Sequence, residues 1–240
     1  MPSGPSAPPA RSASTGTTLG GPAGERPPWA DRFRSIVFEG PIGVGKSSLA
    51  RKFAERFGYD LLLEAPEDNP FLDRFYRDSA RYALSTQLFF LFQRMDQLRN
   101  LSQRDFFAEH LVCDFMLAKD PLFARLTLTE DELVLYQKIY ESLKPQAPIP
   151  DLVVLLQAPP NHLMERIRER AIPMEQGISA DYLADLSDAY TQFFHQYDES
   201  PVLIVNTMAL NPIGDEVDFE ILVQQISNFR GRRAYFNRQS

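Results

Sequence analysis

The sequence lacks the features that would assign it to several common classes of protein. It contains one cysteine, Cys113, which excludes an intrachain disulfide framework and favours a reducing, cytoplasmic location. No apolar run approaches the ~18 residues of a membrane-spanning helix, so no membrane partner is expected. Basic residues number 25 against 32 acidic ones, without long blocks of one sign. This composition does not indicate a surface that binds nucleic acid.

Residues 1–30 are poor in large aliphatic side chains and contain seven Pro, five Gly and four Ser. Such a segment buries too little apolar surface to offset the entropy lost on ordering. We therefore expect a disordered tail over residues 1–30, without the apolar stretch of a secretory signal. Residues 31–240 are long enough for one domain with one hydrophobic core, and no internal repeat is visible.

Apolar runs of strand length alternate with helical patterns after the tail. Strands are expected at 33–39, 59–64, 110–114, 152–156 and 202–205, and helices at 47–57, 70–101, 161–170, 180–197 and 216–229, with two more between 115 and 149. The alternation predicts an α/β fold with a doubly wound, five-stranded parallel sheet flanked by helices. Leu84, Leu88, Leu91 and Met95 share one helical face, which serves either the core or a dimer contact.

Residues 40–47 read Gly-Pro-Ile-Gly-Val-Gly-Lys-Ser and lie directly between an expected strand and an expected helix. This is the pattern and the context of a P-loop, whose backbone N–H groups bind the phosphates of a nucleotide. The alternative is a chance glycine-rich turn. The P-loop predicts bound ATP and Mg²⁺, with Lys46 at the β and γ phosphates and Ser47 at the metal. The expected ATP-binding residues are Gly40, Gly43, Gly45, Lys46, Ser47 and Ser48.

Two acidic residues follow expected strands, Glu64 after the second and Asp114 after the third. In open α/β sheets, ligands bind at the carboxyl ends of the strands. One carboxylate can accept the proton of an attacking hydroxyl while the other positions Mg²⁺. The alternative is that each acid caps the helix that follows it.

Arg166, Arg168 and Arg170 lie within five residues, and Arg166 and Arg170 share a helical face. In an enzyme that transfers phosphoryl groups, arginines on a closing lid can stabilise charge on the transferring group. The alternative is that these arginines pair with Glu165 and Glu169 on an exposed helix as ordinary surface charges.

Together these motifs resemble the deoxynucleoside kinase family. The resemblance runs from about residue 35 to 205 and is carried by segments 39–47, 64–72, 150–152, 166–178 and 182–183, with Tyr76, Gln87 and Arg94 between them. It implies a P-loop kinase fold with an arginine-bearing lid and a homodimer. The implied reaction is ATP-dependent phosphorylation of the 5′-hydroxyl of a deoxynucleoside to the 5′-monophosphate.

The resemblance also implies a role for individual residues. Glu64 would take the 5′-hydroxyl proton as the general base, with Lys46, Arg166 and Arg170 as further catalytic residues. Tyr76 and Glu175 would hold the sugar 3′-hydroxyl, and Gln87 would bond the edge of the base. The implied substrate-binding residues are Glu64, Tyr76, Gln87, Arg94, Asp114, Asp120 and Glu175, and the implied metal-binding residues are Ser47 and Asp114.

The sequence departs from the family at two positions. Phe115 stands where most members have an arginine, with Lys119 nearby as another cation, and Ile172 stands where a further lid arginine is common. Such variants resemble bacterial members that favour purine deoxynucleosides. Two other functions stay open: a nucleotide-binding regulator that has lost phosphotransfer, and a kinase for a nucleoside monophosphate or another small alcohol. Intact Glu64 argues against the regulator, and Tyr76 with Glu175 favours a free sugar hydroxyl.

Overall fold

The computed structural model describes residues 27–102, 110–143 and 148–238, whose centre is a parallel β-sheet. The strands are β1 (Ser35–Glu39), β2 (Asp60–Leu62), β3 (Leu111–Cys113), β4 (Leu152–Gln157), β5 (Val202–Asn206) and β6 (Arg233–Phe236), in the order β2-β3-β1-β4-β5-β6. β1 pairs with both β3 and β4, so the chain winds outward in both directions from β1. This arrangement is the predicted doubly wound α/β fold.

The sheet has one more strand than the sequence predicted. β6 pairs in parallel with β5, its Arg233 opposite Val202, at the edge of the sheet. Its sequence, Arg-Ala-Tyr-Phe, is not an apolar run, and Tyr235 is 67% exposed. An edge strand is held through backbone hydrogen bonds on one side and need not be apolar. The prediction of five strands was wrong for that reason.

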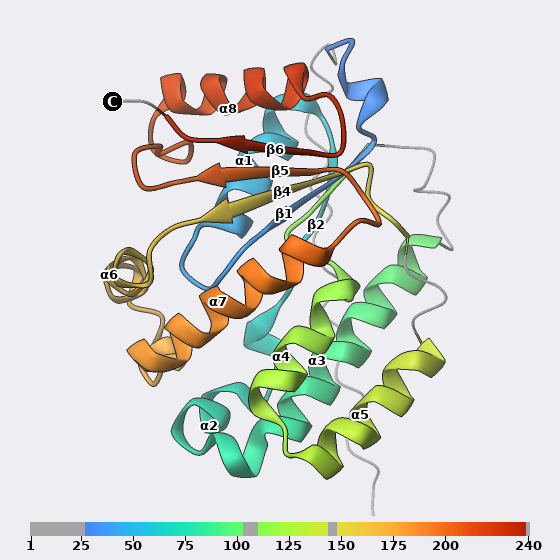
Figure 1. The fold of residues 1–240 in the computed structure, drawn as a ribbon, viewed down its shortest axis with the longest axis vertical. Coiled ribbons are helices and arrows are strands. Elements are labelled where there is room, and N and C mark those ends of the chain that lie inside the picture. Colours follow the sequence, from blue (N-terminus) through green and yellow to red (C-terminus); the bar gives the residue numbers. More distant parts are fainter. Residues whose placement is uncertain (1–26, 103–109, 144–147, 239–240) are drawn as a thin grey trace, which may run out of the picture.

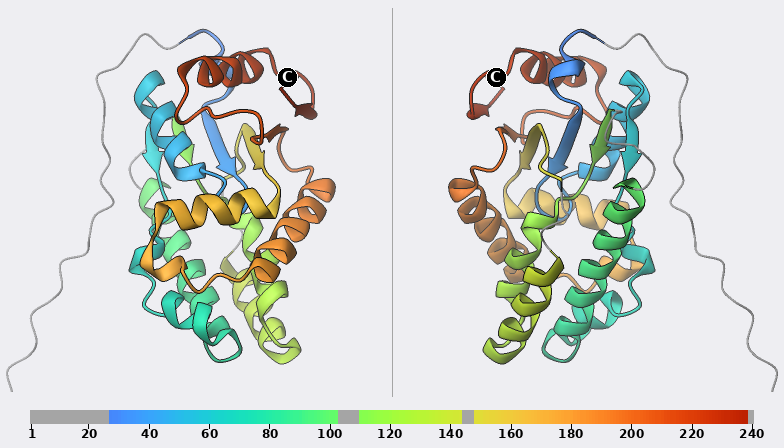
Figure 2. Two further views of the ribbon diagram at one scale, coloured as in Figure 1. Left: turned by 90° about the vertical axis from the view of Figure 1, so that its left-hand side faces the viewer. Right: turned by 90° about the vertical axis from the view of Figure 1, so that its right-hand side faces the viewer.

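Helices cover both faces of the sheet (Figure 1). They are α1 (Lys46–Phe57), α2 (Leu72–Arg77), α3 (Ser79–Ser102), α4 (Asp120–Thr127), α5 (Glu130–Leu143), α6 (Pro160–Arg170), α7 (Ala180–Gln196) and α8 (Glu216–Asn228). α1 and α8 lie together on one side, joined by an ion pair of 3.0 Å between Lys52 and Glu216. α3, α4, α5 and α7 lie on the other side. α6 lies at the carboxyl ends of the strands, facing the viewer in the left view of Figure 2.

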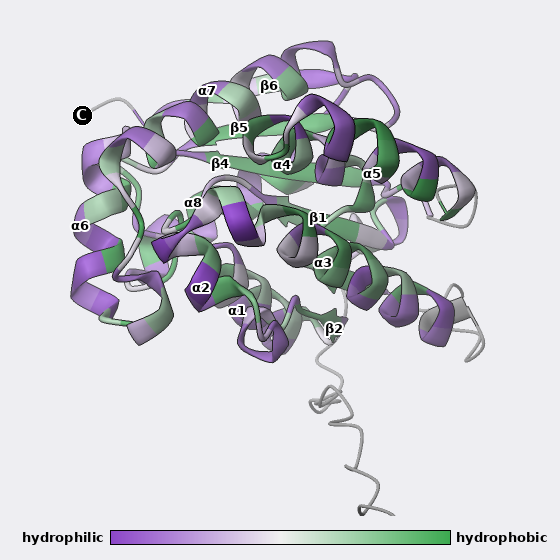
Figure 3. Ribbon diagram, turned by 90° about the horizontal axis from the view of Figure 1, so that it is seen from below, coloured by the Kyte–Doolittle hydropathy of each residue, from purple (hydrophilic) through white to green (hydrophobic). Residues whose placement is uncertain are grey.

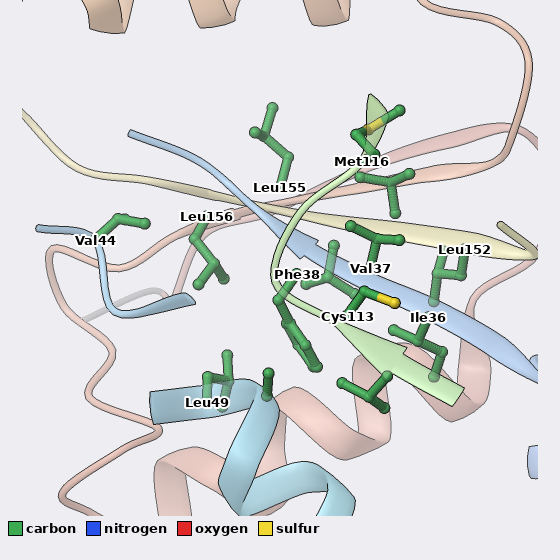
Figure 4. Close-up of a cluster of buried hydrophobic side chains, with 14 of the residues drawn as sticks. Ile36, Val37, Phe38, Val44, Leu49, Cys113, Met116, Leu152, Leu155 and Leu156 are labelled. Carbon is green, nitrogen blue, oxygen red and sulfur yellow. The ribbon is translucent and has the colours of Figure 1, made fainter. Parts of the chain in front are cut away.

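The hydrophobic core lies between the sheet and these helices. Residues 152–156 of β4 are almost completely buried, as expected for a central strand. The ring of Phe38 in β1 packs edge-on against Phe53 of α1, at 5.4 Å between centroids. Figure 4 shows Phe38 close to Leu49, and Figure 3 shows the apolar central strands beside the more hydrophilic α6.

The apolar face of α3 belongs to the core. Leu91 and Met95 are buried, and Leu84 and Leu88 pack against the buried cluster. The face from Leu84 to Met95 therefore serves packing within the chain, which was one of its two expected uses.

The expected tail lies outside the described residues up to position 26. The last part of the expected range is packed: Ala30 is fully buried, and Trp29 contacts Phe57 edge-on at 5.3 Å. Among the residues that the structure describes, none of the helices combines the length and apolar character needed to cross a lipid bilayer.

Candidate active site

The P-loop follows β1 and leads into α1, as predicted. Gly40, Gly43 and Gly45 adopt φ values of +145°, +86° and +99°, which residues with a Cβ rarely adopt. A Cβ at Gly40 would lie 2.3 Å from the carbonyl oxygen of Leu156 in β4. Contacts that require glycine therefore hold the loop against the sheet, in a conformation suited to binding phosphate through backbone N–H groups.

Most of the residues expected at the site line one cavity of about 160 Å³. They come from the P-loop and the start of α1, the ends of β2 and β3, helices α2 and α3, and the end of α6 with the segment after it. The cavity is lined by Gly43, Gly45, Lys46, Ser47, Ser48, Glu64, Tyr76, Gln87, Arg94, Asp114, Arg170 and Glu175. The fold thus brings together residues that lie up to about 130 positions apart, an expected consequence of placing strand ends at one edge of a parallel sheet.

Glu64, Arg94 and Asp120 form a buried ionic network. Nε of Arg94 donates to Oε1 of Glu64 at 2.7 Å, and Nη1 of Arg94 contacts Oδ1 of Asp120. Burial raises the pKa of Glu64, but the charges of Arg94 and Lys119 outweigh burial and lower this pKa to about 2. Burial raises the pKa of Asp120 to about 6, against the opposing charge of Arg94. Glu64 is therefore ionised at neutral pH and held in one orientation.

Ser47 and Asp114 are in contact at the N-terminus of α1, the helix that follows the P-loop. The Ser47 hydroxyl donates to Oδ2 of Asp114, and Oδ1 of Asp114 accepts from the backbone N–H of Glu64 at 2.8 Å. Burial raises the pKa of Asp114, opposed by the hydrogen bond from Ser47. A hydroxyl and a carboxylate fit Mg²⁺, which takes few protein oxygens and completes its shell with phosphates and water. The donor set therefore suits a metal that enters with a nucleotide.

The two expected lid arginines have different surroundings. Nε of Arg170, at the end of α6, donates to Oε2 of Glu175 at 2.8 Å. Arg166 donates instead to the carbonyl oxygen of Thr207 at 3.0 Å and does not line the cavity. Glu165 was one of the two acids expected as alternative partners of these arginines. Its Oε2 lies instead 3.4 Å from Nδ1 of His162, in a weak pair on the surface.

The wall of the cavity away from the P-loop carries Tyr76 and Gln87. Gln87 is buried, and the loop after α6 packs on Tyr76 so closely that a Cβ at Gly177 would lie 2.8 Å from the Cβ of Tyr76. Burial raises the pKa of Tyr76, so its phenol stays protonated and able to donate a hydrogen bond. Glu175, in a short 3₁₀ helix (Pro173–Glu175), lines the same wall.

A model of the family described as deoxynucleoside kinase matches residues 36–230. The chain belongs to the deoxynucleoside kinase family. It is 35% identical over 188 residues to a deoxyguanosine kinase of Bacillus subtilis (strain 168), covering 77% of this chain and 88% of the relative. It is 27% identical over 201 residues to a deoxyadenosine/deoxycytidine kinase of the same organism, covering 80% of this chain and 91% of the relative.

The fold of this kinase is also that of a solved structure. The structure of deoxyadenosine kinase from M. mycoides with bound dATP superposes with a TM-score of 0.71, covering 80% of this chain and 99% of that one at 22% identity. The predicted family and P-loop kinase fold are confirmed.

The kinase also has two site residues that were not among the expected site residues, Glu39 and Lys119, although Lys119 was noted as a nearby cation. Glu39, directly before the P-loop, is fully buried and accepts hydrogen bonds from Gly40, Met116 and Tyr190. Lys119 is 1% exposed, lines the cavity and pairs with Glu39. An acidic residue at the end of a buried strand was the available signal for Glu39. Phe115, where the family arginine was expected, is buried.

Proposed function

We propose that this deoxynucleoside kinase transfers the γ-phosphoryl group of Mg-ATP to the 5′-hydroxyl of a purine deoxynucleoside. The observation that carries the reaction is the placement of Glu64, Lys46 and Ser47 on one cavity. Those residues supply a base, a phosphate-binding cation and a metal ligand to the same small space. In such a reaction the protein acts mainly by positioning and by electrostatic stabilisation.

The base in this proposal is Oε2 of Glu64. The two nitrogens of Arg94 that reach Glu64, Nε and Nη2, both contact Oε1, which leaves Oε2 to accept the 5′-hydroxyl proton. A carboxylate with a pKa of about 2 is a weak base, so it takes the proton late, as the oxygen–phosphorus bond forms. Arg94 therefore orients Glu64 and keeps it charged.

ATP would lie on the P-loop, with Lys46 at its outer phosphates and Mg²⁺ on Ser47 and Asp114. When bound, Mg²⁺ neutralises phosphate charge. Lys46 Nζ donates to the carbonyl oxygen of Pro41 at 3.1 Å, so it already lies over the loop. Arg170 would turn from Glu175 to the phosphates, and Glu175 would then join Tyr76 at the sugar 3′-hydroxyl.

Arg166 would need to leave Thr207 before it could contact the phosphates, since it now donates to both polar oxygens of that residue. Asp120 acts through Arg94 in this proposal, because the structure places it against the guanidinium group.

The purine preference is supported by the relatives and by the cavity. Relatives at 35% and 29% identity are a deoxyguanosine kinase of Bacillus subtilis and a deoxyadenosine kinase of Lactobacillus acidophilus. Beside Gln87, the aromatic rings of Phe90 and Phe123 line the cavity. Gln87 can donate to and accept from a base edge, while the rings offer faces against which a base can pack.

Replacing Glu64 with Gln tests the proposed base. The E64Q variant should lose about 10²–10⁴-fold in kcat while retaining the affinity for ATP, because the amide keeps the shape but accepts no proton. Glu67→Gln, at an exposed position three residues away, is the matched control and should be unchanged. Turnover by E64Q at the wild-type rate would remove Glu64 from the mechanism.

We also propose that the chain forms a homodimer through α3 and α5, which lie side by side. Phe92 on α3 and Val134 and Leu135 on α5 are about half exposed, and large exposed apolar side chains commonly mark protein interfaces. Light scattering should give twice the mass of one chain for the wild type and the mass of one chain for a Val134→Glu, Leu135→Glu variant. A wild-type monomer would contradict this proposal.

A cytoplasmic, reducing location remains part of the proposal. Its support is the single thiol of Cys113, which is free and buried in β3. Detection of the native protein in an oxidising, extracellular fraction would contradict it.

A further inference from the structure

Four groups contact the buried carboxylate of Glu39. Its Oε2 accepts from the N–H of Gly40 at 3.0 Å and from the hydroxyl of Tyr190 at 3.1 Å. Its Oε1 accepts from the N–H of Met116 at 3.0 Å and lies 3.1 Å from Nζ of Lys119. Glu39 therefore ties the start of the P-loop to α7 and to the 3₁₀ helix Leu117–Lys119.

Lys119 is an unusual lysine because its whole side chain is buried. Lysine ordinarily extends its ammonium group into water, and burying that charge is costly. Burial lowers the pKa of Lys119, but the charges of Glu39 and Glu64 outweigh burial and raise it, so the group stays an ammonium. Its three N–H donors meet one carboxylate oxygen within ion-pair distance among the described residues, Oε1 of Glu39.

The cavity has few cations that are free to contact a substrate, and the ammonium group of Lys119 is one of its cations. The guanidinium group of Arg94 is already paired with Glu64 and Asp120, so its charge is not available to a substrate. Arg170, also on the cavity, is paired with Glu175, and the other cations of the lining are Lys46 and Lys119. Lys119 lies near enough to Lys46 for its charge to lower the pKa of Lys46, and near enough to Glu64 to lower the pKa of that base. Lys119 therefore lines the same cavity as the phosphate-binding lysine and the proposed base, close to both.

We propose that Lys119 is a second catalytic lysine, whose ammonium group donates hydrogen bonds to the phosphoryl group as it passes from ATP to the 5′-oxygen. In that step the bond from the γ-phosphorus to the bridging oxygen breaks and its electron pair stays on ADP. A new bond joins the phosphorus to the 5′-oxygen, whose proton goes to Glu64. Glu39 holds the ammonium group in place. This inference rests on the proposed function, because it uses the positions that the proposed function gives to ATP and the substrate.

A purely structural role is the alternative, in which Lys119 only neutralises Glu39. The two roles separate in a variant that removes both charges, Glu39→Gln with Lys119→Met. If neutralisation were the whole role, this double variant would recover the stability and the kcat lost by Lys119→Met. A catalytic lysine predicts that stability recovers and kcat does not.

The experiment measures kcat, KM for deoxyguanosine, Kd for ATP and the thermal midpoint of these variants. We expect kcat of both Lys119→Met and the double variant to fall about 10²–10³-fold, the usual cost of one electrostatic group at a transition state, with KM and Kd within about threefold. Lys138→Met, at an exposed position on α5, is the matched control and should be unchanged. A kcat in the double variant within about threefold of the wild type would overturn the proposal.

If the double variant does not fold, Lys119→Gln decides, since the amide keeps a donor to Glu39 without the charge. A hundredfold lower kcat with unchanged Kd for ATP supports the catalytic role, and a wild-type kcat overturns it. The wild-type assay separates this inference from the proposed function. Failure of the wild type with every deoxynucleoside contradicts the proposed function, whereas an active wild type with an equally active Lys119→Gln contradicts the inference alone.

Discussion

Nε of Arg94 lies 2.7 Å from Oε1 of Glu64, and a second guanidinium nitrogen of Arg94 contacts the same oxygen. The third nitrogen contacts Asp120, which is fully buried. One arginine thus orients the proposed base and neutralises a carboxylate that water does not reach. The position of the base therefore depends on a residue of α3, thirty residues further along the chain.

Replacing Arg94 with Met should destabilise the protein strongly. Removing one partner of a buried ionic network leaves the other charges uncompensated, which costs about 3–5 kcal/mol. Urea denaturation at pH 7 should show this loss, while Arg99→Met, at an exposed position of the same helix, should change stability by less than about 0.5 kcal/mol. Equal, small effects of the two substitutions would mean that the network contributes little.

The activity should fall as pH rises above about 8. Burial, followed by the charge of Lys119, lowers the pKa of Lys46 from 10.5 to about 8, so Lys46 loses its proton and its hold on phosphate above that pH. The kcat/KM for Mg-ATP, which reports the free enzyme, should therefore decline above pH 8.

The stability should change in the opposite sense. Between pH 8 and 10.5 the unfolded chain keeps a proton on Lys46 that the folded chain has released, so this group makes unfolding less favourable as pH rises.

Lys46→Arg tests the predicted decline in activity. Arginine stays charged over this pH range, so the decline in kcat/KM above pH 8 should be absent in this variant. If kcat/KM of Lys46→Arg declines in the same way, the titrating group is not Lys46.

Alanine at two P-loop glycines should have different costs. At Gly40 the new Cβ would lie 2.3 Å from a backbone oxygen of Leu156, which cannot move away without disturbing β4. At Gly45 it would lie 2.5 Å from Cδ1 of Ile213, the end of a flexible side chain. Both positions add backbone strain of about 1–3 kcal/mol.

Thermal denaturation should therefore show a larger loss for Gly40→Ala than for Gly45→Ala. Adding Ile213→Ala should recover part of the Gly45→Ala loss, since it removes the contact with the new methyl group. No recovery would mean that backbone strain alone sets the cost at Gly45.

Asp114→Asn should weaken the response to Mg²⁺. Asp114 supplies a carboxylate beside Ser47, and its loss should raise the Mg²⁺ concentration for half-maximal activity by about 10–100-fold, the range seen when groups around a metal are changed. Binding of ATP without metal should be unaffected. Asp96→Asn, at an exposed position of α3, serves as the control, and an unchanged Mg²⁺ titration in Asp114→Asn would exclude the proposed ligand.

The P-loop and the strand-end acids could be predicted because their signals are local. The glycine spacing at residues 40–47 predicts the backbone conformation of the P-loop. A carboxylate at the end of a parallel strand must lie at the carboxyl edge of the sheet. Tyr76, Gln87 and Glu175 came from the family resemblance, since no local pattern joins α2, α3 and the segment after α6. Their shared cavity is a product of packing between distant elements.

Three features could not be predicted from the sequence. β6 is held by backbone pairing at an edge, which places few demands on side chains. The burial of Lys119 depends on the tertiary position of Glu39, eighty residues earlier in the chain, and lysine is ordinarily exposed. The direction of Arg166, toward Thr207 and not the cavity, depends on side-chain torsions that helical spacing does not determine.

The most direct test is an assay of ADP release with Mg-ATP and each of the four natural deoxynucleosides, run beside Lys46→Ala. We expect turnover with deoxyguanosine or deoxyadenosine at a higher kcat/KM than with deoxycytidine or thymidine, and loss of turnover in Lys46→Ala. Preferred turnover of a pyrimidine would contradict the purine assignment. Absence of turnover with all four, alongside tight binding of ATP, would contradict the account as a whole.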